Sequence, residues 1–372
     1  MDRKESIKTL LMGSISLPFL HVAPSEKTEQ DGKVQDSEPM SSHWAEWPDM
    51  PWTGPEYWGN RLQDWRIVDG KAECIYSGPN RTLHCLTHQL KRRHEDFSVS
   101  VETEILRNTG SRGTYAGFRL GAKAGDFPAP VTFRDYRRAA VFGEGLDAGV
   151  TVDGQLFIGE TKSDPLPETD AAIRLHLDGT VSGRTYTLIL SAYSGESRQT
   201  AGSVRVDGVS PEELEGNVAL ISHVPSGEER PASSARFSDW QLTGSKFVSS
   251  PGKTFGPICF AQYTLNRNLL KVTAQLTPVE TIAGHQVLFQ VRENGSWKTL
   301  QQTTVHELAR TAHFRFEDWP YDEEMPYRIQ LELPLKDGVR RYSYEGTIAA
   351  EPVSAGKLRA AVFSCNKNWG FP

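Results

Sequence analysis

Turn-forming residues place the strongest constraint on what this chain can fold into. Its 32 glycines and 22 prolines fall between short segments in which apolar and polar residues alternate. Alternation with a period of two is typical of half-buried strands, because successive side chains of a strand point to opposite faces. Glycine and proline between such segments favour turns and interrupt helices. The sequence therefore predicts an all-β fold.

Length and charge limit the class of protein further. At 372 residues the chain is long enough for two ordinary domains. Charged residues make up 24% and hydrophobic residues 38%, as expected of globular domains. The net charge of -6 argues against a nucleic-acid partner, because phosphate binding requires a basic surface.

The first residues, 1–23, resemble a signal peptide. Arg3, Lys4 and Lys8 precede an apolar stretch at 9–23 that glycine and proline interrupt. A transmembrane helix needs roughly 20 apolar residues, so the stretch suits a secretory signal better than a membrane span. The arrangement of Arg3 and Lys4 before the apolar stretch resembles a twin-arginine (Tat) export signal in which lysine replaces the second arginine. The alternative is that these residues form a disordered cytoplasmic tail. We expect an exported protein, periplasmic, cell-surface or extracellular, and not an integral membrane protein.

A polar segment without aromatic residues, 24–42, predicts a disordered linker, and residues 43–247 then predict one β domain. The segment at 97–105 alternates strictly, and Asp69-Gly70 forms a hairpin turn between two short strands. About a dozen strands of this kind, stacked as two antiparallel sheets, form a jelly roll.

Four stretches carry a resemblance to a known group of folds: DWRIVDGKAEC, DFSVSVETEI, YAGFRLG and ARFSDWQLTG. They resemble the laminin-G and concanavalin-like sandwiches of exported bacterial proteins, including the 3-keto-disaccharide hydrolase-like family. The resemblance implies a lectin-like jelly roll. Because such folds serve binding as well as hydrolysis, function must be inferred from particular residues.

Aromatic residues are concentrated near the start of this domain, where a sugar ring could stack on them. Trp52, Trp58 and Trp65 are the candidates for contact with a polysaccharide or a cell-surface glycan. The alternative is that these rings fill the core of the sandwich, where large aromatic side chains commonly lie.

Four carboxylates raise the hypothesis of a glycoside-active jelly roll: Glu144, Asp147, Asp153 and Glu160. Glycoside hydrolysis needs two carboxyl groups roughly 5 to 9 Å apart across the sugar. A hairpin turn explains Asp153 and a Gly-Glu-Gly loop explains Glu144, so we assign no catalytic residue.

Two cysteines of this domain, Cys74 and Cys85, flank a turn between predicted strands. A disulfide formed after export and two free core thiols are both compatible with this spacing. The sequence gives no Cβ geometry and leaves the two alternatives open.

Residues 254–350 predict a second β domain. Seven short strands, with Asn-Gly and Asp-Gly turns between pairs, indicate an immunoglobulin or fibronectin type III sandwich. The single cysteine in this stretch, Cys259, cannot form an intradomain disulfide, which favours the fibronectin-like version. We interpret this domain as a spacer.

The sequence ends with KLRAAVFSCNKNWGFP at 357–372. The apolar, non-alternating run at 359–363 is typical of a strand that is buried on both faces of a mixed or parallel sheet. In such sheets ligands bind beyond the carboxyl ends of the strands, where Cys365 and Asn366 lie. A thiolate at this place is a good ligand for a transition metal.

A lectin-like module, an Ig-like module and a strand ending FSCNKNWGFP together resemble the front of exported alkaline phosphatase D-like (PhoD-like) metallophosphoesterases. The resemblance implies that Cys365 ligates iron in an iron-calcium site and that 357–372 is the first strand of a truncated α/β domain. Cleavage of a phosphoester substrate needs the other metal ligands, so we expect no cofactor and no activity in this chain alone. We predict the non-catalytic N-terminal region of such an enzyme. The alternative is a free-standing extracellular glycan-binding or adhesion protein.

Overall fold

Strands and turns make up almost all of the described chain, together with two single-turn 3-10 helices. The computed structural model describes residues 38–106, 112–123, 144–167, 172–194, 200–279 and 286–352. Over these ranges the prediction of an all-β fold is confirmed, and no helix within them is long and apolar enough to cross a membrane. The predicted signal peptide and the predicted strand with Cys365 lie outside the described residues.

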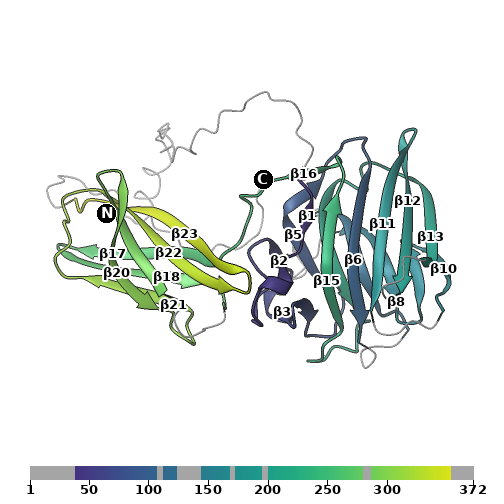
Figure 1. The fold of residues 1–372 in the computed structure, drawn as a ribbon, viewed down its shortest axis with the longest axis horizontal. Coiled ribbons are helices and arrows are strands. Elements are labelled where there is room, and N and C mark those ends of the chain that lie inside the picture. The colour runs from purple at the N-terminus through teal and green to yellow at the C-terminus, as the bar shows by residue number, and fades with distance from the viewer. Residues whose placement is uncertain are drawn as a thin grey trace, which may run out of the picture. The chain divides into compact units, whose positions relative to one another are not determined.

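The first sandwich consists of two antiparallel sheets, called sheet A and sheet B here. Sheet A has the order β13-β12-β11-β6-β15-β4-β3, with β1 paired to β15, and β11, β6 and β15 run side by side in Figure 1. Its strands are β1 (Met40–Ser41), β3 (Trp65–Val68), β4 (Lys71–Cys74), β6 (Phe97–Ile105), β11 (Ile173–Ser182), β12 (Thr185–Ser194), β13 (Thr200–Val209) and β15 (Ala235–Thr243).

Sheet B has the order β10-β9-β8-β7-β14-β5-β16, with β2 paired to β5. Its strands are β2 (Tyr57–Gly59), β5 (Arg81–Leu90), β7 (Tyr115–Lys123), β8 (Glu144–Thr151), β9 (Gln155–Ile158), β10 (Thr161–Pro165), β14 (Gly216–His223) and β16 (Phe247–Ser249). The strands β7 to β10 follow one another in the sequence, whereas β14, β5 and β16, which continue the sheet from β7, come from distant parts of it.

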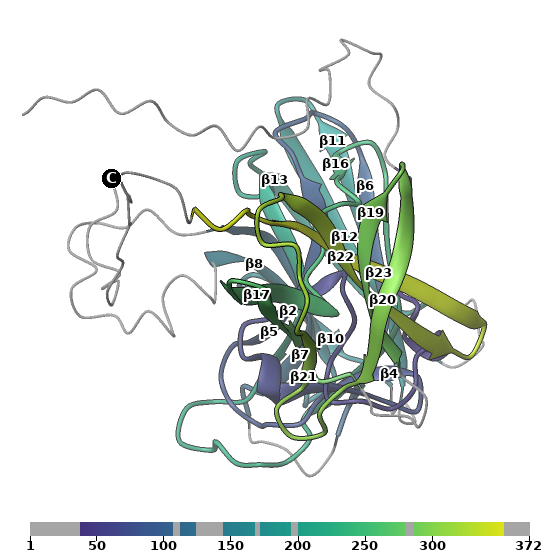
Figure 2. The ribbon, with the colours of Figure 1, turned by 90° about the vertical axis from the view of Figure 1, so that its left-hand side faces the viewer.

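The second sandwich divides seven strands into a sheet of three, β17-β18-β21, and a sheet of four, β20-β19-β22-β23. Figure 2 labels all four strands of the larger sheet. The strands are β17 (Ile258–Asn266), β18 (Leu269–Leu276), β19 (Gln286–Glu293), β20 (Ser296–Thr304), β21 (Thr311–Phe316), β22 (Met325–Leu335) and β23 (Gly338–Ile348). Their apolar faces are buried: in β18, for example, Leu270, Val272, Ala274 and Leu276 are at most 2% exposed.

An aromatic cluster attaches the start of the first sandwich to its core. Trp44 is 1% exposed, its indole N–H donates to the carbonyl of Thr53 at 3.0 Å, and its ring lies 4.9 Å from that of Tyr57. Trp240 of β15, fully buried, lies 5.9 Å from the same tyrosine ring. Since β1 also pairs with β15, the sandwich begins before residue 43, inside the segment predicted to be a linker.

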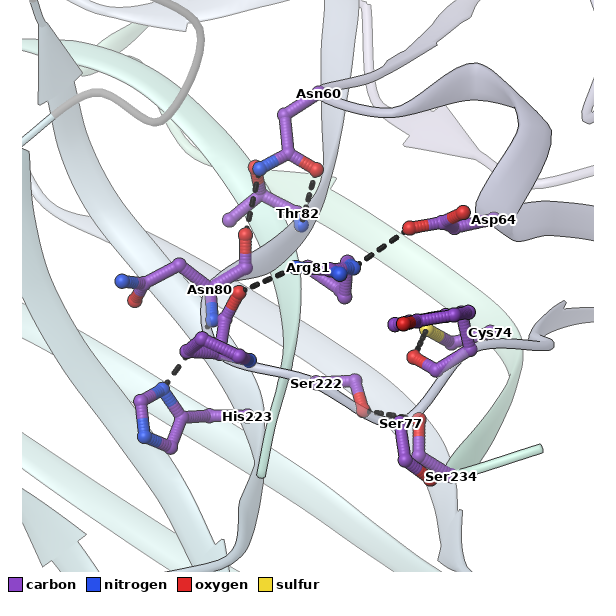
Figure 3. A network of polar contacts seen from close by, with 12 residues as sticks. Asn60, Asp64, Cys74, Ser77, Asn80, Arg81, Thr82, Ser222, His223 and Ser234 are labelled. Carbon is purple, nitrogen blue, oxygen red and sulfur yellow. Dashed lines mark hydrogen bonds and ion pairs between the residues drawn. The ribbon is translucent and has the colours of Figure 1, made fainter. Parts of the chain in front are cut away.

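A buried ion pair lies between the start of β5 and the 3-10 turn before β3 (Figure 3). The Arg81 Nε lies 2.6 Å from Asp64 Oδ2, and the two side chains are 3% and 9% exposed. The same guanidinium donates to the carbonyl of Pro79 at 2.7 Å and lies over the ring of Tyr76. Arg81 is the first residue of β5 in sheet B, and Asp64 ends the 3-10 turn that leads into β3 of sheet A, so the pair joins the start of β5 to that turn.

The two cysteines of the first sandwich are free thiols in the core. Cys74 and Cys85 are both fully buried and unbonded to each other, which decides between the alternatives that the sequence left open. Burial raises the pKa of Cys74 to about 11 and raises that of Cys85 as well. Neither thiol is therefore a nucleophile at neutral pH.

One lysine is enclosed completely. Lys246 is 0% exposed, and its ammonium donates to the carbonyl of Arg93 at 2.9 Å and to the hydroxyl of Tyr186 at 3.2 Å. The tyrosine hydroxyl in turn donates to the same carbonyl at 2.7 Å. Burial lowers the pKa of Lys246. The contact between Lys246 and Arg93 therefore links the segment that follows β15 to the segment between β5 and β6.

Candidate functional site

The face of sheet B that points away from the core carries a line of side chains running across the strands. Phe118 and Leu220 are paired across β7 and β14 and lie in the core, so the residues next to them in each strand point to the opposite face. Successive cross-strand pairs on that opposite face define a set that we call the transverse row: Trp58, His84, Ala219, Arg119 and Asp147.

Arg119 and Asp147 form the centre of polar contacts in this row. The Arg119 Nε lies 2.7 Å from Asp147 Oδ1 and its Nη2 lies 2.8 Å from Oδ2, so the pair is bidentate. Nη2 also donates to Asn80 Oδ1 at 3.1 Å, and the Tyr115 hydroxyl donates to Asp147 Oδ2 at 2.7 Å. Arg119 is only 7% exposed, and such a buried pair is held rigidly because losing either partner leaves a buried charge.

Burial and the ion pair act on the pKa values in this cluster. Burial by itself lowers the pKa of Arg119, but the hydrogen bonds and charge of Asp147 outweigh it and raise that pKa. Burial, followed by the charge of Asp147, raises the pKa of Tyr115 far above its ordinary value. At neutral pH the cluster therefore contains a guanidinium, a carboxylate and a neutral phenol, with a net charge of zero.

Two neutral histidines border the ion pair. His84 lies between Asn217 Oδ1, 2.9 Å from its Nδ1, and the Thr82 hydroxyl, 3.0 Å from its Nε2. His223 stacks on Tyr115 with 4.7 Å between ring centroids, and its Nδ1 accepts the backbone N–H of Asn80 at 3.3 Å (Figure 3). Burial lowers the pKa of both imidazoles from the ordinary 6.5, so both are uncharged at neutral pH.

The histidines predict a loss of stability in mild acid. As the pH falls below 6.5, the two imidazoles bind protons in the unfolded chain, whereas in the folded chain their lowered pKa values keep them neutral. The free energy of unfolding therefore decreases as the pH falls from 6.5 toward the pKa values of the folded chain. We expect the double variant His84→Gln/His223→Gln to show a smaller drop in melting temperature between pH 7.5 and pH 5 than the unaltered chain. The exposed His306→Gln is the control; equal slopes in all three proteins would contradict the expectation.

Beside the polar groups the two central strands carry glycines, and both are buried. Gly117 of β7 and Gly149 of β8 are cross-strand partners beside the transverse row. A Cβ at Gly117 would lie 2.3 Å from the carbonyl oxygen of Ala148, and one at Gly149 would lie 2.2 Å from that of Ala116. No side chain fits at either position, so the backbones of β7 and β8 can pair closely there.

The three tryptophans predicted to contact a glycan lie in different surroundings. Trp52 and Trp65 are 2% and 1% exposed within the core, where their rings offer no surface to a ligand. Trp58 is half-buried, pairs with His84 in the transverse row, and meets the ring of Phe255 edge-on at 4.8 Å. Of the three, Trp58 is therefore the one whose position fits ligand contact.

The predicted carboxylates do not form a catalytic pair in the described part of the chain. Asp153 and Glu160 are exposed and lie in the turns on either side of β9, while the side chain of Glu144 lies outside the described residues. Asp147 has both oxygens engaged in the contacts above. A carboxylate held in this way suits hydrogen bonding to a ligand better than proton transfer. The described residues also contain no group of three or more His, Cys, Asp or Glu that could hold a metal ion.

Most of the site's residues were missed by the sequence reasoning. Tyr115 and Arg119 belong to YAGFRLG, which was interpreted only as a fold signal. Strand parity could have found them: if Phe118 and Leu120 face the core, then 115, 117 and 119 face outward together. The histidines offered no such signal, because their partners are distant in sequence.

Comparison with known proteins gives only a loose similarity. No family model matches the chain, and no curated protein matches it. Among solved structures, winged bean acidic lectin complexed with methyl-α-D-galactose matches with a TM-score of 0.37 and 9% identity, over 56% of this chain and 99% of that one. Lectin II from Ulex europaeus matches with a TM-score of 0.35 and 10% identity, over 57% of this chain and 100% of that one. The VIP36 exoplasmic/lumenal domain, in a form bound to Ca2+ and Man3GlcNAc, matches with a TM-score of 0.32 and 10% identity, over 50% of this chain and 81% of that one.

Proposed function

We propose that this chain is an exported glycan-binding protein and that the transverse row of sheet B is its binding surface. The observation that carries the proposal is one face on which an aromatic ring, Trp58, shares a row with the fixed pair Arg119–Asp147. Ligand sites commonly combine aromatic surface with a few well-placed polar groups, and a sugar presents both an apolar face and hydroxyl groups.

The polar groups can recognise hydroxyl groups without a bound ion. An ionised carboxylate has about four acceptor positions, and the contacts described above use three of those on Asp147. The His223 ring accepts at Nδ1 and so carries its proton on Nε2. Together these side chains offer an acceptor and a donor whose orientations are fixed by neighbours, which favours hydrogen bonding with little loss of side-chain entropy.

Exchange of Asp147 for asparagine tests the site. We expect Asp147→Asn to weaken retardation of the purified chain in gels containing soluble polysaccharide by about tenfold or more, because Arg119 loses its charged partner. The matched control is Asp207→Asn: Asp207 of β13 also accepts a bidentate contact from an arginine, Arg205, but the pair is exposed on the other sheet. Equal retardation of both variants and the unaltered chain would refute the site. A chain that binds no polysaccharide at all would refute the function.

A second proposal follows from the order of modules. The division of the second sandwich into three plus four strands supports a fibronectin type III-like module after a lectin-like one, which is the order that resembles the front of PhoD-like metallophosphoesterases. Under this proposal the glycan-binding sandwich would serve a phosphoesterase, and Cys365 would be an iron ligand of the enzyme's iron-calcium site. Sequencing of the transcript beyond codon 372 tests it: an open frame with further His and Asp ligands supports the proposal, and its lack removes it.

A further inference from the structure

We infer that mild acid weakens ligand binding at the Arg119–Asp147 pair, because a protonated His223 no longer holds the turn that carries Asn80. This inference rests on the proposed function and adds a regulation of the same site. Three observations lead to it: the hydrogen bond between Asn80 and His223, the contacts that depend on Asn80, and the different hydrogen bonds of His84.

One hydrogen bond requires His223 to be neutral. The backbone N–H of Asn80 donates to its Nδ1 at 3.3 Å (Figure 3). A backbone N–H can only donate, so this contact exists only while Nδ1 carries no proton. In the protonated imidazole both ring nitrogens are donors, and two N–H groups would then point at each other. The contact therefore breaks when His223 becomes charged.

The turn held by this hydrogen bond also contacts the ion pair of the site. Asn80 adopts a φ of 52°, in the left-handed region that residues other than glycine seldom occupy without support from their surroundings. Its side-chain oxygen accepts from Arg119 Nη2 at 3.1 Å, and its carbonyl accepts from Asn60 Nδ2 at 2.6 Å. Loss of the contact with His223 allows Asn80 to leave this conformation, and Arg119 then loses one of the groups that orient it.

Burial and two neighbouring charges set the pH at which His223 is protonated. Burial has the largest influence and disfavours the charged ring; the carboxylate of Asp147 favours it and the guanidinium of Arg119 disfavours it. Together they lower the pKa of His223 below the ordinary 6.5. Tyr115, which stacks on the ring, stays a neutral phenol. His223 is therefore neutral at pH 7.5 and takes up a proton only in acid.

The remaining titratable groups on β5, β7 and β8, apart from His84, lie elsewhere. The guanidinium of Arg81 is paired with Asp64 in the buried contact described above. The others belong to the ends of their strands that are far from His223, namely His88 of β5, Lys123 of β7 and Glu144 of β8. Within the described part of the chain, the charges that act on His223 are those of Asp147 and Arg119.

His84 provides a contrast on the same sheet, because its partners tolerate a charged ring. Its Nδ1 lies 2.9 Å from Asn217 Oδ1, and the Nδ2 of that amide donates to the carbonyl of Cys85, so the oxygen facing His84 is an acceptor. Its Nε2 lies 3.0 Å from the Thr82 hydroxyl, which can accept as well as donate. A second proton on His84 therefore breaks neither contact.

The first step of the test examines the turn without any ligand. Hydrogen exchange of the full chain, read by mass spectrometry with fragmentation to single residues, gives the protection factors of backbone amides at pH 7.5 and pH 5. We expect the protection of the Asn80 amide to fall about tenfold in acid. The amide of Thr82, which donates to Asn60 Oδ1, should keep its protection, because its partner does not titrate.

Two substitutions of His223 give this result its controls. In His223→Asn the side-chain oxygen takes the place of Nδ1 and cannot be protonated at these pH values, so Asn80 should be protected equally at both. His223→Leu removes the acceptor, and Asn80 should exchange fast at both. His84→Gln should keep the acid effect of the unaltered chain. Equal protection of Asn80 at both pH values in the unaltered chain would overturn the inference, whatever the chain binds.

The second step measures binding by retardation in gels that contain soluble xylan, mannan, β-1,3-glucan or alginate. For the polymer that retards the chain at pH 7.5, we expect the dissociation constant to rise about threefold or more at pH 5. His223→Asn should lose this pH dependence, whereas His84→Gln should keep it. The exposed His306→Gln of the second sandwich should match the unaltered chain at both pH values.

The outcomes separate the regulation from the function itself. Binding that is the same at both pH values, or an acid effect that persists in His223→Asn, would overturn the inference and leave glycan binding standing. A chain that none of the polymers retards at pH 7.5 would count against the proposed function, and the regulation would fall with it. Melting temperatures at both pH values show whether a lost affinity reflects unfolding.

Discussion

Replacing Asp64 with alanine is expected to lower the free energy of unfolding of the first sandwich by about 3 to 5 kcal/mol, and its melting temperature by roughly 10 °C. The substitution leaves the Arg81 guanidinium, 3% exposed, without the carboxylate that lies 2.6 Å away. The carbonyl of Pro79 and the ring of Tyr76 remain, but neither supplies a negative charge. Calorimetry of the full chain measures the effect and separates the transitions of the two sandwiches.

A second variant shows whether the effect comes from the unpaired charge. Asp64→Leu/Arg81→Met removes both charges and keeps apolar volume, so it should be more stable than Asp64→Ala, since an ion pair replaced as a whole often costs little. The exposed pair Arg205–Asp207 is the control, and Asp207→Ala should leave the melting temperature nearly unchanged. If Asp64→Ala melts like the unaltered chain, the ion pair does not stabilise the sandwich.

Replacing Trp240 with alanine is expected to lower the free energy of unfolding of the first sandwich by about 3 to 5 kcal/mol. The side chain is fully buried, and its ring lies 6.3 Å from that of Trp44 and 5.9 Å from that of Tyr57. Its removal leaves a cavity where the segment before β2 packs on sheet A, so protease cleavage near residue 50 should also become faster. Limited proteolysis with mass spectrometry measures that second effect.

Two comparisons control this result. Trp240→Phe keeps most of the ring and should lose clearly less stability than the alanine variant. Trp297→Ala removes a half-buried ring from the second sandwich and should leave the transition of the first one in place. A cavity that collapses without cost would show itself as equal melting temperatures for the alanine variant and the unaltered chain.

Alternation predicted which side chains of a strand face inward. In β6 the residues Phe97, Val99, Val101 and Thr103 are at most 2% exposed, as the strict pattern of 97–105 indicated. The pattern is local, because it depends on the geometry of one strand. The all-β fold class follows from the same kind of local information.

Strand partners were beyond the reach of such patterns. β6 pairs with β11 and β15, whose paired residues lie 70 or more positions later in the sequence, and nothing in β6 itself specifies them. In β15 the register also shifts between Ser238 and Gln241, where Asp239 adopts a φ of 46°. This bulge, an extra residue against one of β6, is what turns Trp240 inward.

The candidate site depends on these partners more than the fold class does. The transverse row joins β2, β5, β14, β7 and β8, and a shift of one residue in any of these pairings would send a side chain to the opposite face. The tryptophans near residue 50 were conspicuous in the sequence, yet most of them pack into the core. Composition alone could not distinguish a ring that stabilises the sandwich from one that a ligand can reach.

The enclosed ammonium of Lys246 gives the first sandwich a built-in chemical reporter. Amine-modifying reagents can reach this group only when the contacts with Arg93 and Tyr186 break, whereas exposed lysines react at once. Its acylation rate, followed peptide by peptide, therefore measures how often this part of the molecule opens under native conditions. The same measurement in the presence of a polysaccharide would show whether binding on sheet B slows that opening.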